Sequence, residues 1–356
     1  MSEYQHYEWQ AIDRALTGNE VKEVGRLSSH MDLVTPTQAI VTYNWGDFKH
    51  DPIKVMLRYF DTHYYWANWG SRRLAFRFPK GTIDLERVRA YRVDDWLTLR
   101  EEGDYYVLDL DLLDQEPSDW DVGPDGLGPF VRLRQQIIEG DYRALYLVWL
   151  KAAGDGMNVL EGDPEPPVPA GLKELDASLE ALAYSLLEID PFLLEVASAA
   201  SDPLQPLPDG ALAASLAQLA PEECRAYLLA VLRNEPQVRS SLRKRLAGIV
   251  GIEAAPAPGR RTAGELLEEA ERLGQEEHRR RRQEAAQRKR RQELEELARR
   301  EDSVWQETVT TYNRFRGMLI LLLQEGFEIE GLTWVRGATD LRVLLRKDLA
   351  RPGGGD

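Results

Sequence analysis

The sequence predicts an α+β protein: an N-terminal α/β sandwich domain, then a small all-α domain and a long charged helix. Strand-like and helix-like segments alternate over residues 1–155. Leu, Ala and Glu, punctuated by proline, dominate residues 172–250, and Arg and Glu dominate residues 262–310. The two expected linkers, the first of them proline-rich, and the tail, whose structure the sequence leaves open, are residues 156–171, 251–261 and 311–356.

The first elements follow from the residue types in order. Residues 5–12 can form a strand, and Thr17 and Glu20 stand at capping-box spacing before a helix. Residues 38–44 are rich in β-branched and aromatic side chains, as strands prefer. The Asn, Gly and Asp that follow favour a turn, so this region predicts strand, helix and strand.

A second helix is expected over residues 51–67. Asp51 can accept hydrogen bonds from the first-turn amides, and Pro52 has no amide hydrogen to leave unsatisfied. Apolar residues then follow at helical spacing as far as Ala67. Over residues 73–78, Leu and Phe alternate with Arg and Ala, which predicts a strand with one buried face.

The remaining elements of the first domain are shorter. The Asp, Gly and Pro content of residues 114–128 predicts a loop. Hydrophobic patterning predicts a short helix, two strands and two helices at residues 83–91, 96–100, 105–112, 130–138 and 142–152.

Helices are expected in most of the rest of the chain. Prolines divide residues 172–250 into about five short helices. Residues 262–310 predict one helix that would extend roughly 70 Å. Between Leu273 and Leu294 only two alanines are apolar, so the middle is expected to be solvated and held by Glu–Arg pairs rather than by a continuous coiled coil. The tail has apolar residues at 318–323, at Phe327 and Trp334 and at 341–345, and it could form a helix, one or two strands and a last helix.

Charge and composition disfavour several classes of protein. The net charge of −15 argues against a general binder of nucleic acid or of anionic membranes. Cys224 is the only cysteine, which excludes an internal disulfide and a multi-cysteine zinc site and suits a reducing compartment. No apolar run reaches the ~20 residues that span a bilayer, and the first residues lack a signal-peptide pattern. We expect a cytoplasmic protein without membrane contact.

Four aromatic residues are candidates for a binding surface. A helix over residues 51–67 could not bury all of its aromatic rings on one face, so some must meet another element or solvent. Exposed Trp and Tyr are typical anchors of protein interfaces, and packing in the core is the alternative. The candidates are Trp45, Tyr65, Trp66 and Trp69.

Two rows of arginine on the long helix are a second candidate surface. Over residues 260–302 thirteen Arg and Lys stand against twelve Asp and Glu, so the net charge is close to zero. A solvated face or a docking site for an acidic helix is favoured over phosphate binding, because aromatic residues that could stack on bases are absent. These arginine rows are Arg279, Arg280, Arg281 and Arg282, then Arg288, Arg290 and Arg291.

Metal-dependent catalysis has one weak candidate. Asp109 and Asp111 lie two apart in an expected strand and share a face, where they could hold Mg²⁺. The wet face of a half-buried strand is the simpler interpretation. The loop over residues 119–126 departs from a calcium loop at the third ligand and at the glycine. Without other motifs, we expect no catalytic residue, no metal and no cofactor.

Three segments carry a resemblance to a known group of proteins. EYQHYEWQAIDR, TPTQAIVTYNWGDF and ANWGSRRL stand at residues 3–14, 35–48 and 67–74. With them the chain resembles an uncharacterised bacterial protein family, as far as about Val309, beyond which it departs from the family pattern. The genes of this family lie near SWIM zinc-finger genes, so the resemblance implies a protein partner, with a SWIM zinc-finger protein as one candidate.

Taken together, these observations favour a non-enzymatic adaptor that binds another protein. Nucleic-acid binding by the arginine rows is the first alternative. A metal-dependent hydrolase that uses the acidic strand is the second.

Overall fold

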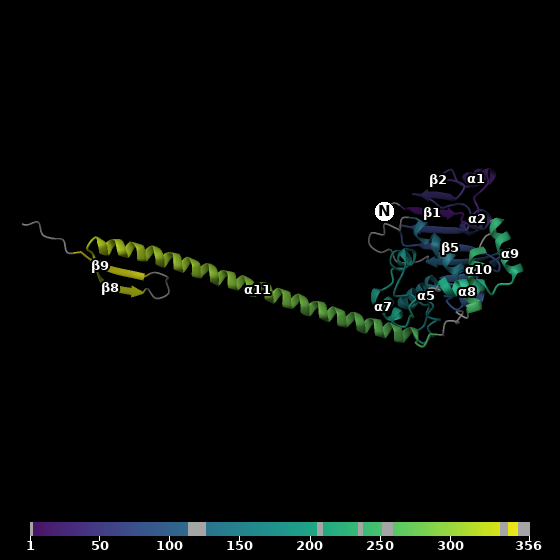
Figure 1. Ribbon diagram of the computed structural model, residues 1–356. Helices are drawn as coiled ribbons and strands as arrows, with labels where there is room; N and C mark the ends of the chain where they lie inside the picture. Colours follow the sequence, from purple (N-terminus) through teal and green to yellow (C-terminus); the bar gives the residue numbers. More distant parts are fainter. Residues whose placement is uncertain are drawn as a thin grey trace, which may run out of the picture. The chain divides into compact units, whose positions relative to one another are not determined.

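The structure is a computed structural model that describes residues 3–112, 126–204, 209–233, 238–250, 259–334 and 341–347 (Figure 1). It confirms the α+β class, with strands and helices that follow one another in the first part of the chain. The chain divides into two compact units, Met1–Gln275 and Glu276–Asp356.

The first unit is built on one antiparallel sheet of seven strands. The strand order is β2-β3-β1-β4-β5-β7-β6, so β1 and β4 lie at its centre. The strands are β1 (Gln5–Gln10), β2 (Met31–Val34), β3 (Gln38–Tyr43), β4 (Thr62–Ala67), β5 (Arg72–Pro79), β6 (Leu97–Glu102) and β7 (Tyr105–Leu112). The sequence predicted five of these strands as strands, predicted β4 as part of a helix and left β2 unassigned.

The second helix is shorter than the sequence predicts, because the prediction of a helix over residues 51–67 was wrong in its second half. Helix α2 (Pro52–Tyr59) ends at Tyr59, and residues 62–67 form strand β4 instead of continuing the helix. The run of Thr, His, Tyr and Trp in β4 suits a strand. It pairs with β1 on one side and β5 on the other, and this tertiary pairing overrides the helical spacing of the apolar residues.

Two helices cover one face of the sheet. Helix α1 (Gly18–Gly25) begins with the expected capping box between Thr17 and Glu20, and Asp51 caps α2 through the amides of Ile53 and Lys54. Their apolar side chains join the rings of Tyr7 and Trp9 in one core cluster. Both helix starts therefore follow from the residues that the sequence singled out.

The opposite face carries a larger helical layer. Its core includes Tyr64, Leu74 and Leu110 from the sheet and Leu145 and Leu182 from the helices. The elements of this layer are α3 (Leu85–Arg89), a 3₁₀ turn (Gly128–Phe130), α4 (Val131–Ile138), α5 (Arg143–Asp155), α6 (Ala177–Glu180), a π-helix (Ala181–Leu186) and α7 (Pro191–Ala199).

The expected small helical domain shares this core. Leu179, Leu186 and Leu193 are buried in the same cluster as the strands. Helices α8 (Asp209–Leu216), α9 (Pro221–Leu232) and α10 (Val238–Val250) follow in the first unit. Whether residues 172–250 could fold alone stays a prediction.

The proline-rich segment is held against the start of the long helix. Pro164 and Thr262 form a β-bridge, and Glu165 is buried between them and the helical layer. The Glu165 carboxylate accepts hydrogen bonds from Arg261 at 2.8 and 3.0 Å and from the Tyr146 hydroxyl at 2.5 Å. The segment is thus a packed part of the first unit, although we expected an extended linker.

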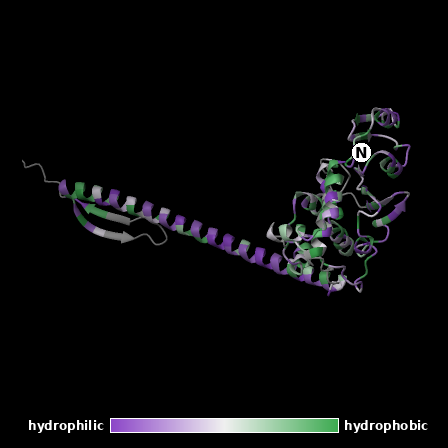
Figure 2. Cartoon of the chain, turned by 45° about the vertical axis from the view of Figure 1, so that its right-hand side comes forward, coloured by the Kyte–Doolittle hydropathy of each residue, from purple (hydrophilic) through white to green (hydrophobic). Residues whose placement is uncertain are grey.

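Helix α11 (Ala263–Gln324) is continuous for 62 residues and outruns the expected end at residue 310. Its first turns belong to the first unit, where Leu266 is fully buried. Figure 2 shows that its middle is hydrophilic, as the Glu and Arg content predicts. In the second unit it is followed by a hairpin of β8 (Glu328–Trp334) and β9 (Leu341–Arg346).

Candidate binding surface

Among the described residues of the sheet domain, Trp45 is the most exposed aromatic residue, at 72% of its full accessibility. It follows β3 in a turn whose Gly46 has a φ of +79°, a left-handed conformation that favours glycine. Buried Tyr43 and Phe48 hold the two sides of the turn in the core. The indole is therefore displayed from a fixed base.

One side chain from another strand fixes this turn. The Gln5 amide nitrogen donates to the Gly46 carbonyl oxygen at 3.0 Å and to the Asp47 carboxylate at 2.9 Å. Its amide oxygen accepts from the hydroxyls of Tyr7 at 2.6 Å and Tyr65 at 3.1 Å. Both polar atoms of this buried amide group are used. Gln5 therefore fastens the turn that carries Trp45 to the sheet.

Trp69 extends from the same end of the sheet. Tyr43 at the end of β3 and Ala67 at the end of β4 both pair with Gln5 of β1, so the two strands finish at one level. Strands β3 and β4 flank β1, so their ends are two strand spacings apart, roughly 10 Å. Trp69 is 37% exposed, and its indole N–H donates to the Ser71 hydroxyl at 3.0 Å. We call Trp45 and Trp69 the tryptophan end of the sheet.

The other two aromatic candidates are packed within the fold. Tyr65 is half-buried, with its ring centroid 4.7 Å from that of Tyr7. Burial raises the pKa of the Tyr65 hydroxyl. Trp66 lies 5.7 Å from the Tyr4 ring and packs against the helical-layer core. The structure therefore exposes Trp45 and Trp69 at one end of the sheet and packs Tyr65 and Trp66 on opposite faces of β4.

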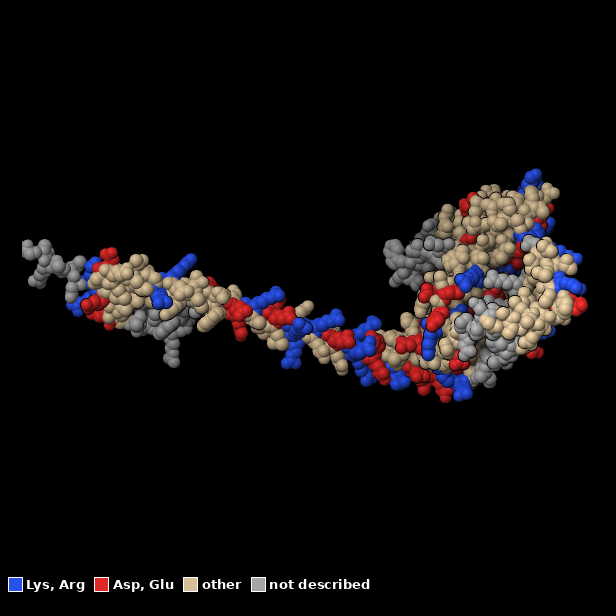
Figure 3. Space-filling view, viewed as in Figure 1, with Lys and Arg blue, Asp and Glu red and all other residues tan. Residues whose placement is uncertain are grey.

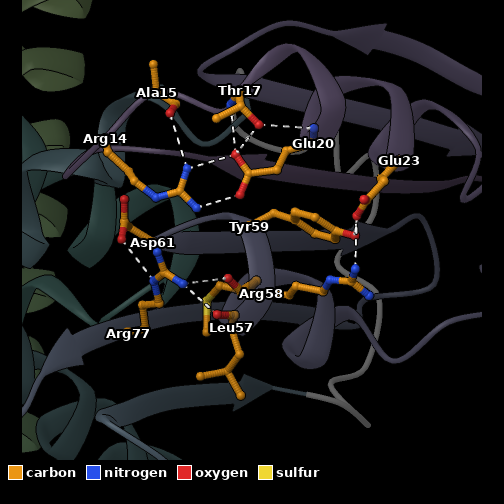
Figure 4. Close-up of polar contacts among 11 residues, drawn as sticks. Arg14, Ala15, Thr17, Glu20, Glu23, Leu57, Arg58, Tyr59, Asp61 and Arg77 are labelled. Atoms are coloured by element: carbon orange, nitrogen blue, oxygen red, sulfur yellow. Dashed lines mark hydrogen bonds and ion pairs between the residues drawn. The ribbon is translucent and has the colours of Figure 1, made fainter.

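Polar contacts tie the covering helices to the sheet (Figure 4). Buried Asp61 accepts from Arg77 Nε at 2.9 Å and from the amides of Ile12 and Asp13. Burial alone would raise the pKa of the Asp61 carboxyl. The buried Arg77 guanidinium and these two amides outweigh that effect and hold the pKa of Asp61 below its usual range. Every group in this cluster has a partner, which is typical of a structural network.

Exposed contacts in the same view fasten α1. Arg14 donates to both carboxylate oxygens of Glu20 at 2.9 and 2.7 Å, and Glu23 accepts from Arg58 and from the Tyr59 hydroxyl (Figure 4). The hydrogen bonds from Arg14 and Thr17 lower the pKa of Glu20 to about 2. These pairs join α1 to α2 and to the segment before it, and none of them forms a reactive constellation.

The acidic strand is neutralised by arginine. Asp109 is buried, and its carboxylate accepts from Arg73 at 2.8 and 2.6 Å and from Arg100 at 2.8 Å. Asp111 lies 3.6 Å from the Arg73 guanidinium. A metal ion would have to displace both cations. Among the residues that the structure describes, no group of three His, Cys, Asp or Glu is placed to hold a metal ion.

The arginine rows lie on the exposed middle of α11, among acidic side chains (Figure 3). Glu277 pairs with Arg280 at 2.7 Å and with Arg281 at 2.9 Å, and Arg291 pairs with Glu295 at 3.0 Å. These are the pairs three and four apart that the sequence predicts. Part of the positive charge is thus compensated along the helix itself.

Two remaining expectations concern a loop and the membrane. Most of the loop that loosely resembles a calcium site, residues 119–126, lies outside the described residues. Over the described part of the chain, no helix is long and apolar enough to cross a bilayer.

Comparison with known proteins adds no relative: no family model, curated protein or solved structure matches the chain.

The residue that sequence analysis missed is Gln5. Its contacts reach 41 and 42 positions along the chain, and a lone Gln in a strand gives no local signal of that role. The glycine after Trp45 was the available hint, since glycine favours the left-handed conformation found in this turn.

Proposed function

We propose that this chain is a non-enzymatic, cytoplasmic adaptor that binds a protein partner through the tryptophan end of the sheet. The observation that supports it is the exposure of Trp45 on a turn that Gln5 holds in place. A rigid, exposed indole loses little conformational entropy on binding and buries a large apolar area. Such residues are common hot spots.

The partner would present an apolar pocket that accepts an indole. Trp69 offers a second anchor at the same end of the sheet, beyond a strand two positions away from β3, which is compatible with one interface of ordinary size. The resemblance described above makes a SWIM zinc-finger protein the first candidate to test. The long helix would then set the distance to a second contact.

Nucleic-acid binding by the arginine rows remains the second candidate. The exposure of these side chains favours it, and the glutamates paired with Arg280, Arg281 and Arg291 weaken it. A hydrolase that uses the acidic strand is the third, and the guanidinium groups around Asp109 compete with a metal there.

The test is affinity capture with the full chain and its Trp45→Ala variant. We expect the variant to retain at most about one tenth of the captured partner. Its free energy of unfolding should change by no more than about 0.5 kcal/mol, because Trp45 is exposed. Tyr184→Ala, which truncates another exposed aromatic residue, is the matched control and should capture the partner as the wild type does.

Nuclease treatment of the lysate separates the two leading candidates. If capture is unaffected by Trp45→Ala and is lost on nuclease treatment, binding runs through nucleic acid and the proposal fails. Retention after nuclease treatment together with loss in the Trp45→Ala variant supports it.

A further inference from the structure

A narrow stripe of exposed side chains runs along α11 within the second unit. Leu294, Trp305, Tyr312 and Leu323 are 59%, 66%, 63% and 43% exposed, and Glu301 and Arg316 are exposed between them. The steps along the stripe alternate between seven and four residues. At about 100° per residue, these six positions fall within about 60° of the helix circumference.

The chemistry of this stripe is symmetric about its centre. In chain order it reads apolar, acidic, aromatic, aromatic, basic and apolar. Leu294 and Leu323 lie at equal distances from the peptide bond between residues 308 and 309. The same holds for Glu301 and Arg316, and for Trp305 and Tyr312.

We propose that a second copy of this chain binds this stripe, with the two α11 helices antiparallel about residues 308 and 309. A two-fold interface uses the same patch on both subunits, so the patch must complement itself. In this register Leu294 meets Leu323, Trp305 meets Tyr312 and Glu301 meets Arg316 of the second copy. Each contact occurs twice, and each joins like polarity or opposite charge.

Charge beyond the stripe agrees with the same register. The antiparallel arrangement places the basic row that ends at Arg291 level with Glu325 and Glu328, which follow the helix. A parallel, in-register pair would instead set Glu301 against Glu301, Arg316 against Arg316 and the basic row against itself. Like charges placed opposite each other are repulsive, so the antiparallel pair is favoured.

The hairpin leaves the stripe open. Figures 1 and 2 place β8 and β9 alongside this end of α11, and Phe315, Leu319 and Leu322 are half-buried there. The stripe borders that half-buried face, with Leu319 at their shared edge, and the six side chains of the stripe stay exposed. Helix surfaces with this much apolar area are normally covered by another element, and the symmetry of the stripe identifies a second copy as that element.

Charge reversal tests both the dimer and its direction in the full-length chain. Sedimentation should show a dimer whose dissociation constant rises at least about tenfold in Glu301→Arg and in Arg316→Glu. The double variant should return to within about threefold of the wild type, because each reversed charge again meets its opposite. A parallel pair would gain nothing from the double variant, so absence of rescue would contradict the proposal.

Two further variants guard against an effect on folding. Glu296→Arg makes the same charge change on the opposite side of α11 and should leave the dissociation constant unchanged. Trp305→Ala should raise it roughly 30-fold while the helical circular dichroism stays the same. A wild-type chain that is monomeric at about 100 μM, well above the micromolar range of ordinary weak interfaces, would overturn the proposal.

Discussion

His63 shows at the scale of one residue how tightly the sheet is built. Its ring is fully buried between Trp9, at 5.0 Å, and Tyr7, at 6.3 Å, and its Nδ1 lies 3.1 Å from the Glu8 carbonyl oxygen. Its Nε2 has no hydrogen-bond partner among the residues that the structure describes. Burial lowers the pKa of this imidazole from 6.5 to about 3, so the folded protein holds it neutral.

This residue should make the protein less stable in mild acid. Below pH 6.5 the unfolded chain binds a proton at His63 and the folded chain does not, so stability falls with pH down to about 3. Between pH 6.5 and pH 5 the expected loss is about 1.5 kcal/mol. Urea unfolding at several pH values measures it, and His63→Phe should remove the loss over this window.

An exposed histidine supplies the control. His50→Gln should leave the pH dependence of the wild type intact. If His63→Phe keeps the same slope between pH 6.5 and pH 5, another group dominates and the account of His63 is wrong.

Strand β4 shows what sequence patterning could and could not predict for an element. The cap at Asp51 was confirmed because capping depends on neighbouring residues. The end of α2 was missed because Tyr64 and Ala67 have both helical spacing and strand character. Only their pairing with β5, the next strand, and with β1, which is distant in sequence, decides between the two. The same reason explains the tryptophan end of the sheet. The sequence named Trp45 and Trp69 as candidates, but it missed Gln5, whose side chain on β1 contacts the turn after β3 and Tyr65 on β4.

The start of α11 is an element held by one buried carboxylate. Glu165→Gln would leave the guanidinium of Arg261 without its charged partner, which typically costs on the order of 3 kcal/mol. We expect faster amide hydrogen exchange at Leu266 and Ala270, which dock on the helical-layer core. Exposed Glu268→Gln should not change exchange there. If exchange at Leu266 and Ala270 is as slow in Glu165→Gln as in the wild type, the apolar contacts alone hold the helix start.

At the scale of the whole molecule, the sequence predicted the class and the long helix, but it could not tell which of its candidate aromatic residues are exposed. The class follows from periodicity, which is local. Exposure of Trp45, and of the symmetric stripe on α11, depends on which neighbours the fold supplies. The first unit offers an anchored indole and the second offers a self-complementary helix face, and an adaptor needs one surface for a partner and can use another for assembly.

Site-specific photocrosslinking tests the central claim, that the tryptophan end binds a protein. A photoreactive phenylalanine derivative is placed at position 45, at position 69 or, as a control, at position 184, in cells of the source organism. The account predicts one discrete adduct of the same partner from positions 45 and 69 and none from position 184. No adduct from position 45, or the same set of bands from all three positions, would contradict it.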